Sequence, residues 1–184
     1  MDSELVEIQK RVGVTADGVW GPKTRHAIAL SLGITAAKPA AGGVDAPWFD
    51  LARTQMGTKE TPGAGNSAAV AEYFKASMGT VYADSVPWCA AFVGAMLAQA
   101  GYKPSGSLMA RSYLTWGSTL AGPRRGAVVV FKRGAAPAGH VAFVDDWDGK
   151  TVKCIGGNQS DAVTLASFAR ASVLGFRWPT EVAA

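Results

Sequence analysis

A change of pattern at Gly126 constrains the fold of this 184-residue chain more than any other feature. Before Gly126, apolar residues recur at helical spacing or fill long apolar stretches, as in CAAFVGAMLAQA over 89–100. After it, turns separate five short runs rich in Val and Phe, at 126–132, 140–146, 151–155, 163–168 and 173–178. Helices followed by consecutive strands predict an α+β domain, in which N-terminal helices pack on an antiparallel sheet of about five strands.

Residues 36–46 form the clearest boundary. Their sequence, AAKPAAGGVDA, has small side chains, a proline and a glycine pair, and nothing to bury, so we expect a flexible linker. The predicted organisation is therefore a small helical module over 1–35 and a main domain over 47–184. The module should hold one helix that ends at Gly13 and a second over 22–32. In the main domain we expect helices over 47–56, 66–77 (capped by Asn66), 89–100 and 110–116.

Composition excludes several classes of function. No apolar run approaches the ~20 residues of a membrane span, and the charged N-terminus lacks the apolar centre of a signal peptide. We therefore expect a monomer made in the cytoplasm, with no stable membrane insertion. The net charge of +4 is spread along the chain, which argues against a nucleic-acid partner. Two Cys and two His without paired spacing predict no metal and no cofactor.

Cys89 and His140 are the candidate catalytic pair. Cys89 begins the apolar segment, and the unpaired N–H groups of a helix start favour a thiolate. By itself, Cys89 would more simply be a buried core cysteine. His140, however, lies alone in a strand-like run, GHVAFV, where burying an imidazole requires hydrogen-bond partners. Together the two residues favour a nucleophile and a base.

A third residue should orient the imidazole. We predict Asn158 for this role, because a neutral amide holds the ring without adding negative charge; Asp161 is the alternative. Tyr82, Asp84 and Trp88 flank the nucleophile and are candidates for shaping a substrate cleft. Packing explains these three residues equally well.

Two stretches resemble known families. IQKRV (8–12) followed by DGVWGPKTRHAI (17–28) resembles the peptidoglycan-binding domain of bacterial and phage wall hydrolases. The resemblance implies a wall-binding module, shorter here than is usual, with Asp17 and Trp20 as candidate contacts to the wall.

Residues 47–179 are similar to CHAP-type amidase/peptidase domains, which have a papain-like fold. The likeness is carried by PWFDLAR (47–53), PGAGN (62–66), VPWCAAFV (86–93), GHV (139–141) and GGNQSD (156–161). It implies Cys89 as nucleophile, His140 as base and Asn158 as the third member. Many relatives carry an acidic residue near this last position; here Gly156 and Gly157 precede Asn158, so the acid is missing or supplied differently.

Together the two resemblances imply a phage endolysin. Such an enzyme hydrolyses an amide of the peptidoglycan stem peptide, or the link between glycan and peptide, once the membrane has been permeabilised. Alternatives are a wall-degrading toxin delivered between bacteria, a non-catalytic wall-binding or virion protein, and an acyltransferase that uses the same thiolate.

Overall fold

The computed structural model describes residues 3–14, 16, 28, 31, 46–61 and 66–180. The predicted first helix is present as α1 (Ser3–Arg11), and Gly13 follows it with a φ of 74°. Leu5 and Gln9 are buried, whereas Ile8 is 41% exposed. The predicted second helix lies outside the described residues except for Ile28 and Ser31, as do Asp17, Trp20 and most of the predicted linker.

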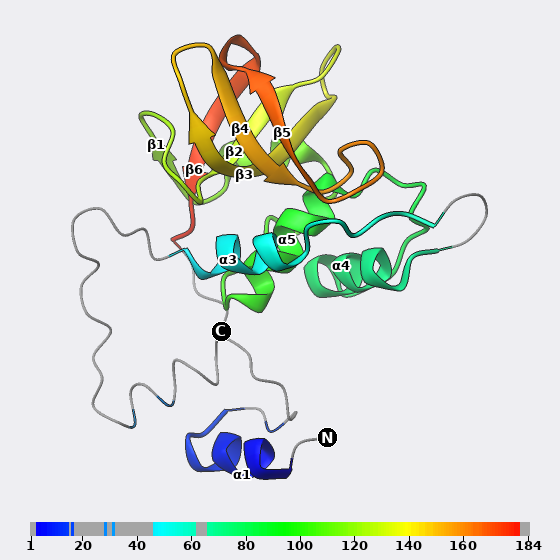
Figure 1. Cartoon of the computed structure of the whole chain (residues 1–184), viewed down its shortest axis with the longest axis vertical. Helices are drawn as coiled ribbons and strands as arrows, with labels where there is room; N and C mark the ends of the chain where they lie inside the picture. Colours follow the sequence, from blue (N-terminus) through cyan, green and yellow to red (C-terminus); the bar gives the residue numbers. More distant parts are fainter. Residues whose placement is uncertain are drawn as a thin grey trace.

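The main domain has two layers, a sheet and a group of helices beneath it (Figure 1). The helices are α3 (Pro47–Thr54), α4 (Ala68–Met78) and α5 (Cys89–Gln99), with 3-10 helices at Ala110–Thr115 and Arg170–Ser172. The six strands are β1 (Ser118–Leu120), β2 (Val128–Lys132), β3 (Gly139–Trp147), β4 (Thr151–Gly156), β5 (Thr164–Ala169) and β6 (Val173–Trp178). Every pairing is antiparallel, in the order β1-β6-β2-β3-β4-β5, which confirms the predicted α+β class.

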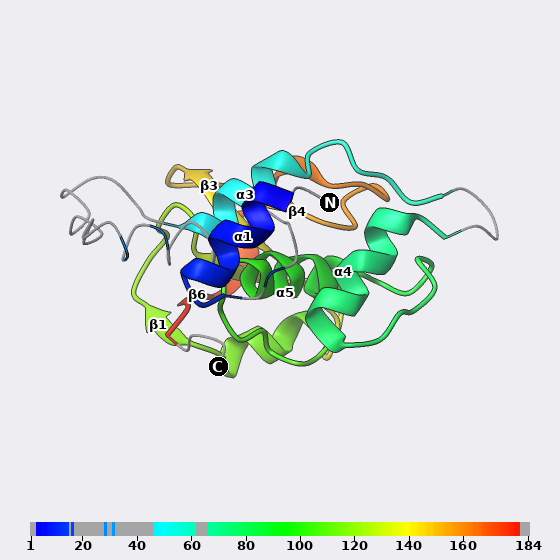
Figure 2. The ribbon, with the colours of Figure 1, turned by 90° about the horizontal axis from the view of Figure 1, so that it is seen from below.

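Helix α5 is the central helix of the lower layer. It contacts both α3 and α4, and Figure 2 shows the three helices from below. Nine consecutive residues, 89–97, are buried, because α5 meets helices on its sides and strand β3 above. Burial on all sides explains why this segment is apolar throughout rather than along one stripe.

The sheet buries both of its faces. Alternate residues of β3 point to opposite sides, so Val141 and Phe143 pack with the helices, whereas Ala142 and Val144 join a second cluster on the far face. The far-face cluster also contains Phe131 and, partly buried, Phe168. The same alternation places His140 on the far face, with Ala142 and Val144.

Two local expectations differ from the structure. Strand β1 was not predicted, because three residues are too few to show an alternating pattern; it forms through pairing with β6. Ser67, not Asn66, is the N-cap residue of α4. The side-chain oxygen of Asn66 instead accepts a hydrogen bond from the backbone N–H of Asp84, 3.1 Å away. None of the helices in the described part of the chain is long and apolar enough to cross a bilayer.

Candidate active site

Cys89 is the first residue of α5, as the sequence predicted, and its side chain is almost fully buried. The backbone N–H of Val141 lies beside the sulfur, as do the N–H groups of Cys89 and Ala90 at the helix start. Because Val141 directly follows His140, the thiol lies next to the end of β3 from which the imidazole projects. The fold thus brings the predicted nucleophile and base to the same end of one strand.

Burial opposes the thiolate that the helix start alone would favour. Desolvation raises the pKa of Cys89 above its usual value. The N–H groups of Val141 and Ala90 and the positive charge of Arg133 lower it, but they do not outweigh the burial. The sequence-based expectation of a thiolate is therefore wrong for the resting protein. The thiol is protonated at neutral pH and needs a base.

His140 stands near the start of β3 and is only 3% exposed. Its ring lies on the face of the sheet away from the helices, stacked near Phe131 and tilted against Phe168, with centroid distances of 6.3 and 5.2 Å. These aromatic neighbours restrict the rotamers of the imidazole. The position of the ring therefore follows from the pairing of His140 with Phe131 across β2 and β3.

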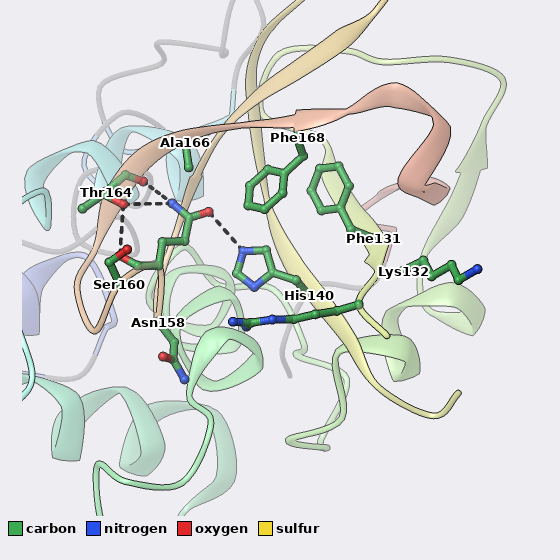
Figure 3. A pocket seen from close by; sticks show the side chains of 10 residues that line it. Phe131, Lys132, His140, Asn158, Ser160, Thr164, Ala166 and Phe168 are labelled. Atoms are coloured by element: carbon green, nitrogen blue, oxygen red, sulfur yellow. Dashed lines mark hydrogen bonds between the residues drawn. The ribbon is translucent and has the colours of Figure 1, made fainter. Parts of the chain in front are cut away.

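Gln159 determines which nitrogen of His140 carries the proton. Its Oε1 lies 3.0 Å from His140 Nε2, and its Nε2 donates to the backbone oxygen and Oγ1 of Thr164 at 2.6 and 3.2 Å (Figure 3). A backbone oxygen only accepts, so the amide orientation is set and Oε1 must face the ring. His140 Nε2 is then the donor, and Nδ1 keeps its lone pair. Nδ1 is buried without a hydrogen-bond partner among the described residues.

Asn158, predicted as the orienting residue, is not the residue that holds the imidazole. Asn158 lines the neighbouring pocket, and its successor Gln159 makes the hydrogen bond to His140. Asn158, Ser160 and Asp161 all have positive φ, at 56°, 54° and 57°, which is uncommon for residues other than glycine. This left-handed loop turns Gln159 back over the end of β4. The backbone oxygen of Asp161, the alternative candidate, accepts the N–H of Glu60 at 2.9 Å.

Gly156 is the one sequence feature that could have indicated the role of Gln159, because the absence of a side chain at position 156 leaves room for its amide. A Cβ built at position 156 would lie 2.7 Å from Oε1 of Gln159 and 3.0 Å from Cβ of Ala142. Any side chain here would displace the amide that holds His140. The group that contacts Nε2 of His140 is thus the amide of Gln159, not an acidic side chain.

The imidazole is neutral at rest. Burial lowers the pKa of His140 from 6.5 to about 4; the hydrogen bond to Gln159 raises it, and the charge of Arg133 lowers it further. A neutral ring with its proton on Nε2 is a base ready to accept a proton at Nδ1. The resting pair is therefore a thiol and a neutral imidazole.

A pocket of about 320 Å³ opens beside His140. Its ten lining residues are Phe131, Lys132, Arg133, His140, Asn158, Gln159, Ser160, Thr164, Ala166 and Phe168. Figure 3 shows the phenyl rings of Phe131 and Phe168 close to the imidazole, whereas Lys132 extends away from it. The pocket thus offers apolar surface, hydroxyl and amide groups, and positive charge beside the candidate base.

Trp88, predicted to shape a substrate cleft, is a core residue instead. Its side chain is fully buried, and its Nε1 donates a hydrogen bond to Oε1 of Glu60. Gly157 packs so closely on the indole that a Cβ there would collide with it. Trp88 is therefore not available to a substrate in this structure.

Asp84 and Tyr82 also pack within the protein. Asp84 is buried, and its Oδ2 accepts the backbone N–H groups of Thr61 and Ser67 at 3.1 and 2.9 Å. The carboxylate thereby links Thr61 to Ser67. Tyr82 is 38% exposed, and its ring packs at a tilted angle against that of Phe74. None of the residues lining the pocket is Trp88, Asp84 or Tyr82.

Within the described residues, no three Cys, His, Asp or Glu side chains group in a way that could hold a metal ion. Asp148 has a structural role in the turn between β3 and β4. Its Oδ1 accepts the backbone N–H groups of Lys150 and Thr151, both at 2.6 Å, and so closes the turn.

Comparison with known proteins relates part of the chain to one family. Residues 81–158 match the family described as the CHAP domain, a segment that holds Cys89, His140 and Asn158 and ends one residue before Gln159. A search of curated proteins finds no match to the chain. CHAP domains are cysteine- and histidine-dependent amidohydrolases or peptidases, and Cys89 and His140 are residues of these two types. The match over residues 81–158 therefore indicates an enzyme of the peptidoglycan hydrolase type, with a Cys/His amidase or peptidase activity.

Proposed function

We propose that this protein hydrolyses an amide of the peptidoglycan stem peptide, or the link between glycan and peptide, with Cys89 as nucleophile and His140 as general base. One observation carries the proposal. The buried His140 has Nε2 engaged by Gln159 and Nδ1 without a partner among the described residues, at the end of β3 where Val141 contacts the thiol. A base with a defined tautomer and a buried thiol at the same end of one strand suit nucleophilic acyl transfer.

The reaction would proceed in two steps. Nδ1 of His140 takes the thiol proton as Sγ of Cys89 attacks the carbonyl carbon, and the imidazolium returns that proton to the departing amine as the C–N bond breaks. Water then attacks the thioester, giving one proton to His140, and the thiolate leaves and is reprotonated. The N–H groups at the start of α5 would stabilise the oxyanion.

Gln159 acts in this mechanism as a positioning residue. Its Oε1 accepts a hydrogen bond from Nε2–H in both charge states of the imidazole, so the contact persists as the ring becomes positive. Because the amide is neutral, it stabilises the imidazolium less strongly than a carboxylate would, which suits a base with a low pKa.

Mass spectrometry of purified peptidoglycan after digestion tests the proposal. The wild type should release new fragments whose masses identify the cleaved bond, and Cys89→Ala and His140→Ala should release none while remaining folded. Cys154→Ala is the matched control, because Cys154 is equally buried but lies in the far-face cluster. Fragments from Cys89→Ala, or none from the wild type, would overturn the proposal.

We further propose that the enzyme serves as a phage endolysin, made in the cytoplasm and acting on the wall after membrane permeabilisation. The support is the resemblance of 1–35 to a wall-binding module, followed by the predicted linker over 36–46 and the catalytic domain over 47–184. Expression in a bacterium with and without a co-expressed pore-forming protein tests this role. Lysis that depends on the pore is expected; lysis of neighbouring cells without a pore would favour a toxin.

A further inference from the structure

Arg133 places an uncompensated positive charge at the rim of the pocket. It directly follows β2, is exposed, and lines the pocket together with His140. The ion pairs found among the described residues are Glu7–Lys10, Glu72–Lys75 and Arg125–Asp145, and Arg133 takes part in none of them. Among the described residues that line the pocket there is no Asp or Glu to neutralise the guanidinium.

Arg133 is also the cation that acts on the reacting groups. Its charge lowers the pKa of both Cys89 and His140, which places the guanidinium within electrostatic range of the thiol and the imidazole together. Lys132 is not among the causes of either shift, and its side chain extends away from the imidazole in Figure 3. A group held by Arg133 would therefore lie near the bond that is cut.

The other residues that line the pocket restrict which chemical group Arg133 could bind there. A guanidinium presents a planar fork of N–H donors, which matches the two oxygens of a carboxylate. The side chains of Asn158 and Ser160, which also line the pocket, add further donors. Phe131 and Phe168 provide an apolar surface for the carbon chain that carries the charge. An anionic group on a short peptide side chain or terminus fits this combination.

We propose that Arg133 and this pocket form a subsite for a free carboxylate of the stem peptide, so that the enzyme selects peptides in which that group is a carboxylate rather than a carboxamide. This rests on the proposed hydrolase function. Recognition of the carboxylate by Arg133 would place the scissile amide between Cys89 and His140. Binding of the anion would also offset the positive charge that opposes protonation of His140.

Paired synthetic substrates test the subsite. Muramoyl pentapeptides are made with every carboxylate free or, one at a time, as the carboxamide, and kcat/KM is measured for each. One amidation should lower the wild-type value about tenfold, a modest factor because Arg133 is exposed to solvent. Arg133→Gln should reduce this preference to about twofold, and Arg133→Lys should retain part of it. The ratio of two substrates cancels the effect of Arg133 on Cys89 and His140.

Lys132→Gln is the comparison variant: Lys132 also lines the pocket, but its side chain extends away from the imidazole, so its loss should reduce the preference much less than Arg133→Gln. An equal loss in Lys132→Gln, or the same preference in Arg133→Gln as in the wild type, would overturn the proposal. Calorimetric binding of the same peptides to Cys89→Ala separates the two hypotheses. If Cys89→Ala binds the carboxylate peptides preferentially but the wild type cleaves none, the subsite is retained and the hydrolase proposal is rejected. If the wild type cleaves the peptides but neither binding nor cleavage shows a preference, the hydrolase proposal is retained and the subsite is rejected.

Discussion

Gln159 Oε1 lies 3.0 Å from His140 Nε2, while the nitrogen of the same amide donates to the backbone oxygen of Thr164 at 2.6 Å. Thr164 begins β5, next to Gly156 at the end of β4, so the sheet itself sets the orientation of the amide. The amide in turn assigns the proton of His140 to Nε2. The pairing register of β4 and β5 thus determines which nitrogen of His140, on β3, carries the proton.

Gln159→Ala should lower kcat by about 10- to 100-fold and leave KM nearly unchanged, because the imidazole loses its orientation but the pocket keeps its other walls. Asn158→Ala is the matched control, one residue away and without the contact to His140, and it should lower kcat far less. Steady-state kinetics on a defined muropeptide measures both. A larger loss of kcat in Asn158→Ala would restore Asn158 as the orienting residue.

Gly156→Ala should impair the enzyme through Gln159. The new methyl would lie 2.7 Å from Oε1 of Gln159, so the amide must move and the hydrogen bond to His140 weakens. We expect a loss of kcat close to that of Gln159→Ala. Gly149→Ala, at a position with open space around it, should be neutral.

A double-mutant cycle checks this coupling. If Gly156 acts by leaving room for the amide, adding Gly156→Ala to Gln159→Ala should cost little further activity. Fully additive losses would show that the methyl at position 156 acts elsewhere, for instance on Ala142.

The low pKa of His140 predicts an acid-sensitive fold. The pKa is about 4 in the folded protein and near 6.5 unfolded, so the unfolded chain binds the proton more readily between these values. The free energy of unfolding therefore has its full value above pH 6.5. It falls by up to about 3 kcal/mol as the pH decreases towards 4, because the unfolded chain gains a proton that the folded protein does not. Urea unfolding of wild type and His140→Gln across pH 4 to 7 isolates this contribution. Parallel pH curves for the two proteins would contradict it.

Asp84→Ala should destabilise the fold by about 1–3 kcal/mol, because the N–H groups of Thr61 and Ser67 lose the buried carboxylate that accepts their hydrogen bonds. Asp84→Asn retains a side-chain oxygen and should cost less. Denaturant midpoints measure the change in stability. At temperatures where the variant is folded, its KM should match that of the wild type; a raised KM would return Asp84 to a role in substrate binding.

The sequence predicted much of the local structure because periodicity is a local property. The continuous apolar run at 89–100 indicated α5 with Cys89 at its start, and the short runs after Gly126 indicated five of the six strands. The positions of Cys89 on a helix start and His140 on a strand were confirmed. Strand β1 has no such pattern, and its existence depends on pairing with β6.

The site itself depends on long-range packing. The sequence by itself determined the α+β class and the elements that carry Cys89 and His140, because both follow from apolar patterning and residue type. Only the tertiary structure decided that Gln159 rather than Asn158 holds the imidazole, because a left-handed loop and the missing side chain of Gly156 bring that amide over β4. Only the tertiary structure decided that Cys89 rests as a thiol, because the desolvation that opposes its charge comes from distant segments packed around α5.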